Sequence, residues 1–209
     1  STGLGPYTKS KIQSEKIARE FQQNGAPVNI VYPGGIFGPK DPNPNLSDSM
    51  GMLTEILKRN LGLTASSAKL AMVDVRDVAN VCVGALEVES KNARYHAWGE
   101  LVTMDQVIDL VKKITDRNIR FYSTPLFLLD AMGTFGEVFT LATRIRLPFA
   151  KESMKMFTQN ARVNGPGKID QSRANNDFGF QSISLEESLR DALLWLHQAG
   201  HLTDKQSGK

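Results

Sequence analysis

Residues 6–11 read Pro-Tyr-Thr-Lys-Ser-Lys, and a run rich in helix-forming residues follows them as far as Asn24. Tyr7 and Lys11 are four residues apart, so on a helix their side chains project from the same face. A positive charge roughly 4 Å from a phenol stabilises the phenolate by about 4 kcal/mol at an effective dielectric constant of ~20. The spacing therefore suits a tyrosine that exchanges protons near neutral pH. Two polar residues at the start of an ordinary amphipathic helix are the alternative interpretation.

A predicted strand and a glycine-rich turn come next. Residues 28–32 are typical of a buried strand in a parallel sheet, and residues 33–39 read Pro-Gly-Gly-Ile-Phe-Gly-Pro. Ligands of parallel sheets bind at the carboxyl ends of the strands. Small residues such as Gly34 and Gly35 permit close approach at such an end, although a plain turn is also open.

Three motifs in this order resemble the extended short-chain dehydrogenase/reductase family. The first is Tyr-x-x-Ser-Lys with the strand and turn that follow it, and the second is Met-Val-Asp-Val-Arg-Asp-Val-Ala at residues 72–79. The third is the tail, from Asp-Gln-Ser-Arg-Ala at 170–174 through Phe-Gly-Phe at 178–180 to Ser-Leu-Glu-Glu-Ser-Leu at 184–189. This family includes nucleotide-sugar epimerases, dihydroflavonol reductases and hydroxysteroid dehydrogenases, and the resemblance spans nearly the whole chain.

The resemblance implies an α/β fold that corresponds to the C-terminal part of a Rossmann-type, NAD(P)-binding protein. In this family an N-terminal dinucleotide-binding half carries the Gly-rich turn, the ribose-reading residue and the catalytic serine, and we expect that half to be missing here. Residues 1–38 would then be the end of the Rossmann domain, with one helix and one parallel strand. Residues 39–209 would mostly form the substrate-binding domain, with a return to the Rossmann sheet around residues 70–97.

The activity implied by the resemblance is NAD(P)-dependent oxidoreduction at a carbonyl or alcohol group. Tyr7 would act as the acid/base, while Lys11 would support it and hold the nicotinamide ribose. The cofactor, NAD or NADP, would contact this pair and the turn after the predicted strand. The residues are Tyr7, Lys11, Pro33, Gly34, Gly35 and Ile36. No metal site is expected.

The most apolar segment, residues 125–149, bears on the substrate. It reads as helices that wall an apolar pocket, as a dock for a membrane surface or partner, or as a core-packing helix pair. Together with residues 72–79, it favours the dihydroflavonol-reductase and hydroxysteroid-dehydrogenase branch and an apolar small-molecule substrate. A sugar-nucleotide epimerase or dehydratase is one alternative, and a non-catalytic fragment or scaffold is another.

Composition limits the remaining classes. The apolar content is 41%, the charged content is 22% and the net charge is +3, with basic residues scattered along the chain, so nucleic-acid binding is not indicated. The single Cys82 excludes an intrachain disulfide framework, and its apolar surroundings predict a core thiol.

No membrane-spanning segment is predicted, and a cytoplasmic enzyme is the default. A homodimer or a complementing N-terminal half are the partners left open. For the 209 residues alone, we expect weak or no NAD(P)H binding and self-association.

Local signals predict several helix ends. Asp74 and Asp77 are interpreted as N-caps rather than catalytic groups, Thr103 as the cap of a helix over residues 104–113, and Ser184 with Glu187 as a capping box. Apolar residues at helical spacing predict this helix, one that ends near Asn60 and one over residues 185–199. The final residues, 203–209, are expected to fray.

Overall fold

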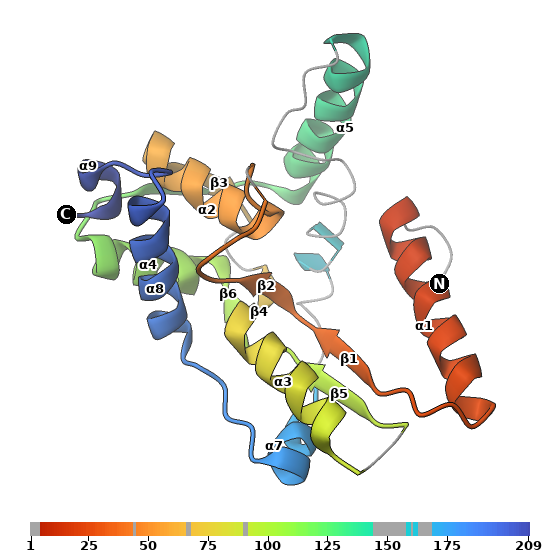
Figure 1. Ribbon diagram of the computed structural model, residues 1–209. Helices are drawn as coiled ribbons and strands as arrows, with labels where there is room; N and C mark the ends of the chain where they lie inside the picture. Colours follow the sequence, from red (N-terminus) through yellow and green to blue (C-terminus); the bar gives the residue numbers. More distant parts are fainter. Residues whose placement is uncertain are drawn as a thin grey trace.

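The computed structural model describes residues 5–43, 45–65, 68–89, 92–143, 158–159, 161–162 and 169–209. Their strands form three short sheets (Figure 1). The first pairs β1 (Ile30–Pro33) with β5 (Arg94–Ala97) in parallel, with Ile30 opposite Arg94 and Pro33 opposite Ala97. The pairing is parallel, as predicted, but β1 is less buried than its apolar run indicated: residues 30–32 are half-buried and Pro33 is exposed.

The second sheet continues directly from the first. After Gly34 the chain enters β2 (Gly35–Phe37), which pairs in parallel with β4 (Lys69–Asp74). The other edge of β4 pairs in antiparallel fashion with β6 (Glu100–Thr103). A third sheet pairs β3 (Leu61–Thr64) with β7 (Arg120–Ser123) in parallel.

Helices connect and cover these strands. Along the chain they are α1 (Pro6–Gln23), α2 (Asp48–Arg59), α3 (Val75–Glu87), α4 (Met104–Thr115), α5 (Leu126–Thr143), α7 (Ser172–Phe178), α8 (Leu185–Gln198) and α9 (Asp204–Ser207). The largest core cluster joins α2, α4 and α8, where Leu57, Val111 and Leu196 are fully enclosed. A smaller cluster packs α3 and α7 around Tyr95 of β5. The helical periodicity that predicted α2, α4 and α8 is therefore the pattern of their buried faces.

The capping predictions are confirmed at three helix starts. The Thr103 side chain accepts from the Gln106 N–H, with a reciprocal bond from the cap to the Gln106 side chain. Asp74 accepts from the Arg76 N–H at the start of α3, and Ser184 accepts from the Glu187 N–H at the start of α8. Each bond satisfies a backbone donor that the helix itself leaves unpaired. The Ser184 cap is therefore confirmed, whereas the structure does not give the reciprocal Glu187 bond of the predicted capping box.

The prediction that Asp77 caps α3 is wrong. Its side chain is buried, and one carboxylate oxygen accepts from the Ile183 N–H, 3.0 Å away, which fixes the segment between α7 and α8. The other oxygen has no hydrogen-bond partner among the described residues. Burial raises the pKa of Asp77, although the Ile183 N–H opposes this. The fold therefore favours the neutral acid.

We expect Asp77→Asn to gain stability over the wild type as the pH rises. A carboxyl group whose folded-state pKa is raised binds its proton more tightly in the folded protein, so its contribution to stability falls from about pH 4 upwards. Asparagine keeps the acceptor for Ile183 and cannot ionise. Urea unfolding near pH 4 and pH 7 would measure the difference, with the exposed Asp105→Asn as a control. An Asp77→Asn effect equal at both pH values would contradict the assignment.

Two other predictions are wrong. The tail does not fray: α9 begins with a capping box between Thr203 and Gln206, and Leu202 is buried beside it. Cys82 is exposed, because the buried face of α3 is formed by Val81 and Ala85, and Cys82 lies one residue off that face.

The apolar segment at 125–149 forms α5 as far as Thr143, and residues 144–149 lie outside the described part. Leu129 is buried against Ala65 and Ala68, whereas Phe127 and Phe135 are 73% and 66% exposed. Of the described helices, none has both the length and the apolar composition required to cross a bilayer.

Candidate active site

Helix α1 carries the predicted catalytic pair and lies beside the β1–β5 sheet. It begins at Pro6 and ends at Gln23, with Asn24 as its C-cap. The next residue, Gly25, adopts a positive φ of 84°. The chain then reverses into β1, so α1 runs antiparallel to β1 and its first turns lie toward the carboxyl end of that strand (Figure 1). None of the residues of α1 is buried. The helix is therefore held by few contacts with the described residues.

Tyr7 and Lys11 are brought together as the i, i+4 spacing predicts. The Lys11 ammonium lies 5.5 Å from the centroid of the Tyr7 ring. Tyr7 is 55% exposed, and in the described part of the chain neither its hydroxyl nor the Lys11 ammonium makes a hydrogen bond or an ion pair. Both polar groups are thus available to a bound molecule.

The middle of α1 is tied to β1 by Tyr32. The Tyr32 hydroxyl donates to Glu15 Oε1 over 3.0 Å, and the Arg19 guanidinium lies 2.9 Å from the same oxygen. Burial, and next the hydrogen bond to Glu15, raise the pKa of Tyr32. The Tyr32 hydroxyl therefore keeps its proton and acts as a donor.

His96 of β5 extends this group of side chains. Its ring stacks on Tyr32, with centroids 5.2 Å apart and planes inclined by 28°. His96 Nδ1 lies 3.2 Å from the Asp170 carbonyl oxygen. Because a carbonyl oxygen only accepts, this contact requires the proton on Nδ1. The sequence did not predict that Tyr32 and His96 contact each other and α1, because hydrophobic periodicity describes single elements. It does not indicate which strand contacts a helix 17 or more residues away.

The turn at Pro33–Ile36 joins the first two sheets. A Cβ added to Gly34 would lie 2.9 Å from the Trp98 carbonyl oxygen and 3.0 Å from the Ala71 carbonyl oxygen, and one at Gly35 would lie 3.1 Å from the latter. The Gly34 N–H donates to the Ala97 carbonyl oxygen. Close packing of this chain's own backbone thus accounts for both glycines. Contact of Pro33, Gly34, Gly35 and Ile36 with a cofactor stays a prediction.

The loop after β5 meets the same end of the sheet. Gln171 Oε1 accepts from the backbone N–H groups of Trp98 and Gly99, at 2.7 Å and 3.1 Å, and its amide donates to the Gly99 carbonyl oxygen. The Trp98 indole Nε1 is buried, and the described residues offer it no acceptor. This donor, which sequence analysis also missed, stands beside the predicted cofactor turn.

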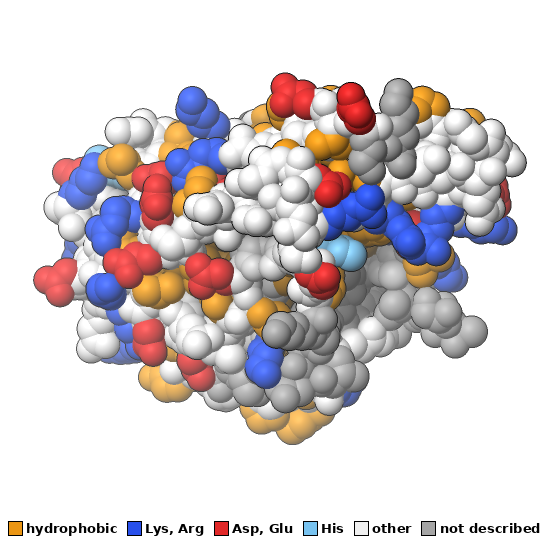
Figure 2. Space-filling view, turned by 90° about the horizontal axis from the view of Figure 1, so that it is seen from below, with side chains coloured by type: hydrophobic (Ala, Val, Ile, Leu, Met, Phe, Trp, Pro, Cys, Tyr) orange, Lys and Arg blue, Asp and Glu red, His pale blue; other side chains and the backbone are white. Residues whose placement is uncertain are grey.

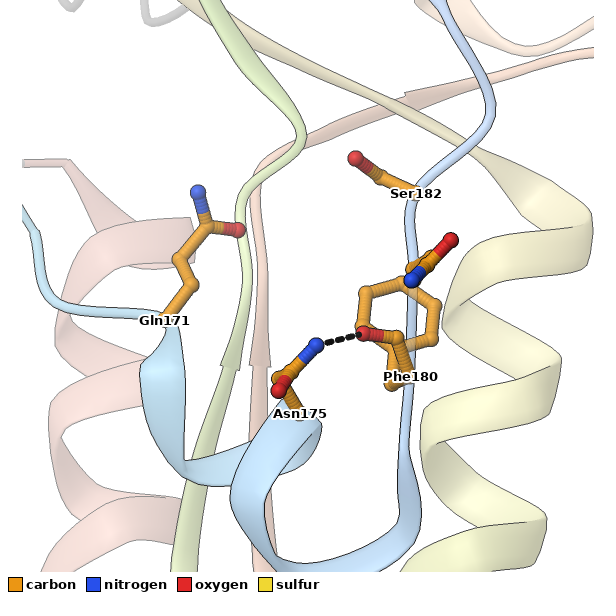
Figure 3. Close-up of a pocket in the computed structure, with 5 residues that line it drawn as sticks. Gln171, Asn175, Phe180 and Ser182 are labelled. Carbon is orange, nitrogen blue, oxygen red and sulfur yellow. Dashed lines mark hydrogen bonds between the residues drawn. The ribbon is translucent and has the colours of Figure 1, made fainter.

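An open pocket of about 360 Å³ lies between α7 and the segment that follows it. Figure 3 shows Gln171, just before α7, and Asn175, on α7, on one side of the pocket and Phe180 and Ser182 on the other. The Asn175 amide donates to the Phe180 carbonyl oxygen over 3.1 Å. Since Gln171 and Asn175 are engaged by the backbone, the pocket mainly reflects how α7 is anchored.

The surface carries charges of both signs. In Figure 2, over much of the left half of the view, Lys and Arg side chains are interspersed with Asp and Glu. Among the residues the structure describes, no group of three or more His, Cys, Asp or Glu side chains could hold a metal ion.

Two curated proteins resemble the chain in sequence, while no protein-family model matches it. A putative dihydroflavonol 4-reductase of Synechocystis sp. is 25% identical over 204 residues, which are 95% of this chain and 57% of that protein. Sterol demethylase protein B of Methylococcus capsulatus is 24% identical over 195 residues, or 93% of this chain and 57% of that protein. The chain thus spans a little over half the length of these relatives.

Solved structures settle the fold. UDP-glucuronic acid 4-epimerase from Bacillus cereus, in complex with UDP-glucuronic acid and NAD, superposes with a TM-score of 0.64 at 15% identity, over 94% of this chain and 54% of the epimerase. RMD from Pseudomonas aeruginosa, complexed with NADPH, gives 0.62 at 16% identity, over 93% of this chain and 57% of that one. The chain has the fold of the extended short-chain dehydrogenases/reductases. It covers only part of that fold, as the order of its motifs predicted.

The comparisons confirm the predicted resemblance to this dehydrogenase/reductase group, including its dihydroflavonol-reductase-like members. The related structures hold NAD in one case and NADPH in the other, in line with the predicted cofactor class. The site residues on α1 and in the turn after β1 are not tested by these similarities.

Proposed function

We propose that this chain contributes the acid/base pair of an NAD(P)-dependent oxidoreductase acting on a carbonyl or alcohol group. The observation that carries the proposal is the position of the Lys11 ammonium, 5.5 Å from the centroid of the Tyr7 ring, in the first turns of α1 toward the carboxyl end of β1 (Figure 1). Parallel sheets bind their ligands at that end.

The residues present fit a nicotinamide cofactor at one part of the site. Lys11 offers three unpaired donors suited to ribose hydroxyl groups. The turn is less accommodating, because the free side of Gly34 and Gly35 is already filled by the carbonyl oxygens of Ala71 and Trp98. We therefore propose Tyr7 and Lys11 as the principal contacts, with Pro33 and Ile36 beside them; both are exposed.

The proposed mechanism uses two side chains of this chain. A bound nicotinamide supplies or accepts the hydride. In reduction, Tyr7 donates its hydroxyl proton to the substrate carbonyl oxygen, which becomes the alcohol, and in oxidation Tyr7 accepts the alcohol proton. The positive charge of the Lys11 ammonium stabilises the phenolate left on Tyr7 when the proton is transferred.

We propose an apolar small molecule as the substrate. The names of the relatives refer to a dihydroflavonol and a sterol, both of them largely apolar compounds. Helix α5 adds Phe127 and Phe135 as large exposed apolar side chains, which could cover such a molecule.

The proposed division of the chain follows the predicted one. The parallel pairing of β1 with β5 supports a return of the chain to the Rossmann sheet at residues 94–97. The parallel pairing of β4 with β2, which lies within residues 1–38, supports including residues 69–74 in this return, while the antiparallel pairing with β6 joins β4 to the rest of the chain. A cytoplasmic location, a homodimer and a complementing N-terminal half remain predictions.

Nicotinamide absorbance during turnover tests the proposed reaction. The protein, as its gene encodes it, would be incubated with NADH or NADPH and a panel of apolar ketones and aldehydes. A reductase consumes the reduced cofactor in proportion to the alcohol formed. An epimerase of sugar nucleotides would convert substrate with no net change in absorbance, and a scaffold would convert nothing; either result would overturn the proposal.

A further inference from the structure

Four side chains link α1 to both strands of the first sheet. Glu15 and Arg19 stand on α1, Tyr32 is the penultimate residue of β1, and His96 lies opposite Tyr32 on β5. The Tyr32 hydroxyl donates to Glu15, Arg19 pairs with Glu15, and His96 stacks on the Tyr32 ring. The contact of His96 with the Asp170 carbonyl oxygen continues the series to the segment before α7.

This series is the main attachment of a helix that is otherwise loosely packed. No residue of α1 is buried, and its first turn has no side-chain cap. Outside this series, the Gln22 side chain donates to the Val28 carbonyl oxygen over 2.8 Å, a bond that holds only the last turn of α1 and the loop after it. Glu15 is the attachment nearer to the catalytic pair, since Lys11 and Tyr7 lie about 6 Å and about 12 Å from it along the helix axis.

We propose that Tyr32 and Glu15, braced by His96, are positioning residues that hold the first turns of α1 against the end of β1. They act through the helix and touch neither substrate nor cofactor. Catalytic groups lose much of their effect when they are displaced by about 1 Å, so a fixed helix would matter for Tyr7 and Lys11. That consequence rests on the proposed function, whereas the attachment itself does not.

Hydrogen exchange of α1 tests the attachment directly. Tyr32→Phe removes the hydroxyl but keeps the ring that stacks on His96. We expect the amides of residues 9–14 to exchange about tenfold faster in this variant, because a hydrogen bond to a charged acceptor is lost and local opening becomes easier. Glu15→Ala should give the same result, while Glu15→Gln, which keeps an acceptor oxygen, should stay near the wild type.

Two controls separate positioning from general destabilisation. Tyr122→Phe removes the hydroxyl of an exposed tyrosine on β7 and should leave α1 unchanged. The amides of α8 should exchange at wild-type rates in every variant, since α8 belongs to the largest core cluster, which contains no residue of α1. Unchanged exchange of residues 9–14 in both Tyr32→Phe and Glu15→Ala would overturn the proposal, as would equal acceleration in α1 and α8.

A cofactor titration of the same variants keeps the two proposals apart. If the wild-type protein binds NADH or NADPH, Tyr32→Phe and Glu15→Ala should each weaken that binding about fivefold, and Glu15→Gln should bind with nearly wild-type affinity. If the wild type binds neither, the proposed function fails, while the exchange experiment still decides whether Tyr32 and Glu15 hold α1. Binding that Tyr32→Phe leaves intact, despite faster exchange in α1, would overturn the link to the site.

Discussion

Tyr7→Phe is expected to lower kcat by about three orders of magnitude, in the middle of the range that general acid/base catalysis contributes. The substitution removes the hydroxyl that would exchange the substrate proton and leaves the ring beside Lys11, 5.5 Å from the ammonium. Because Tyr7 lies in an exposed first turn, we expect the fold to be nearly unchanged. The affinity for NADH or NADPH should fall far less than kcat, because Lys11 and the ring of residue 7 remain. Steady-state kinetics and a fluorescence titration would measure the two quantities.

A matched variant makes the Tyr7 result specific. Tyr122 is also an exposed tyrosine, at 56% against 55% for Tyr7, but it lies on β7 in a different sheet. Tyr122→Phe should therefore retain wild-type kcat. If Tyr7→Phe kept more than about a tenth of the wild-type kcat, Tyr7 would not be the acid/base, since the smallest such contributions are near a hundredfold.

Gly99→Ala is expected to destabilise the protein by roughly 3 kcal/mol, the largest stability change we anticipate for a single methyl group. Gly99 connects β5 to β6 with a φ of 64°, a conformation that side chains rarely adopt. A Cβ there would overlap the Met72 carbonyl oxygen and lie 2.7 Å from Val73 Cα. The loop after β5 would have to move away from β4, and the Gln171 bonds that fix it would be disturbed.

Gly25→Ala provides the control for backbone strain alone. Gly25 also has a positive φ, of 84°, but a Cβ there would meet no atom within 4 Å. We expect a loss of about 1 kcal/mol, the cost of the left-handed conformation. Urea unfolding of the two variants separates strain from overlap. Equal losses would show that the close approach at Gly99 does not exist.

The sequence predicted local features well. Tyr7 and Lys11 lie on one helix face because four-residue spacing fixes that geometry, whatever the rest of the chain does. The caps at Thr103 and Ser184 follow from side chains that bond to backbone only three residues away. The order of the motifs, taken as a whole, pointed to the fold that the related structures share.

Contacts between distant segments could not be predicted in the same way. The short strands β3 and β6 show only weak alternation of apolar and polar residues. They form strands because they pair with β7 and β4, which lie far away in the sequence. Gly34 and Gly35 were interpreted as room for a ligand, whereas backbone carbonyl groups from residues 71 and 98 occupy that space. Asp77 had the position of a helix cap but bonds to Ile183, 106 residues further along.

One titration tests the central claim most directly. The protein encoded by the gene would be titrated with NADH and NADPH, followed by nicotinamide fluorescence, in the wild type and in Lys11→Met. The account predicts saturable binding of at least one cofactor and an affinity at least about tenfold weaker in Lys11→Met, because the ammonium supplies charge-assisted hydrogen bonds to the ribose. Absence of binding by the wild type, or equal affinity in both proteins, would contradict the proposal that α1 forms part of an NAD(P) site.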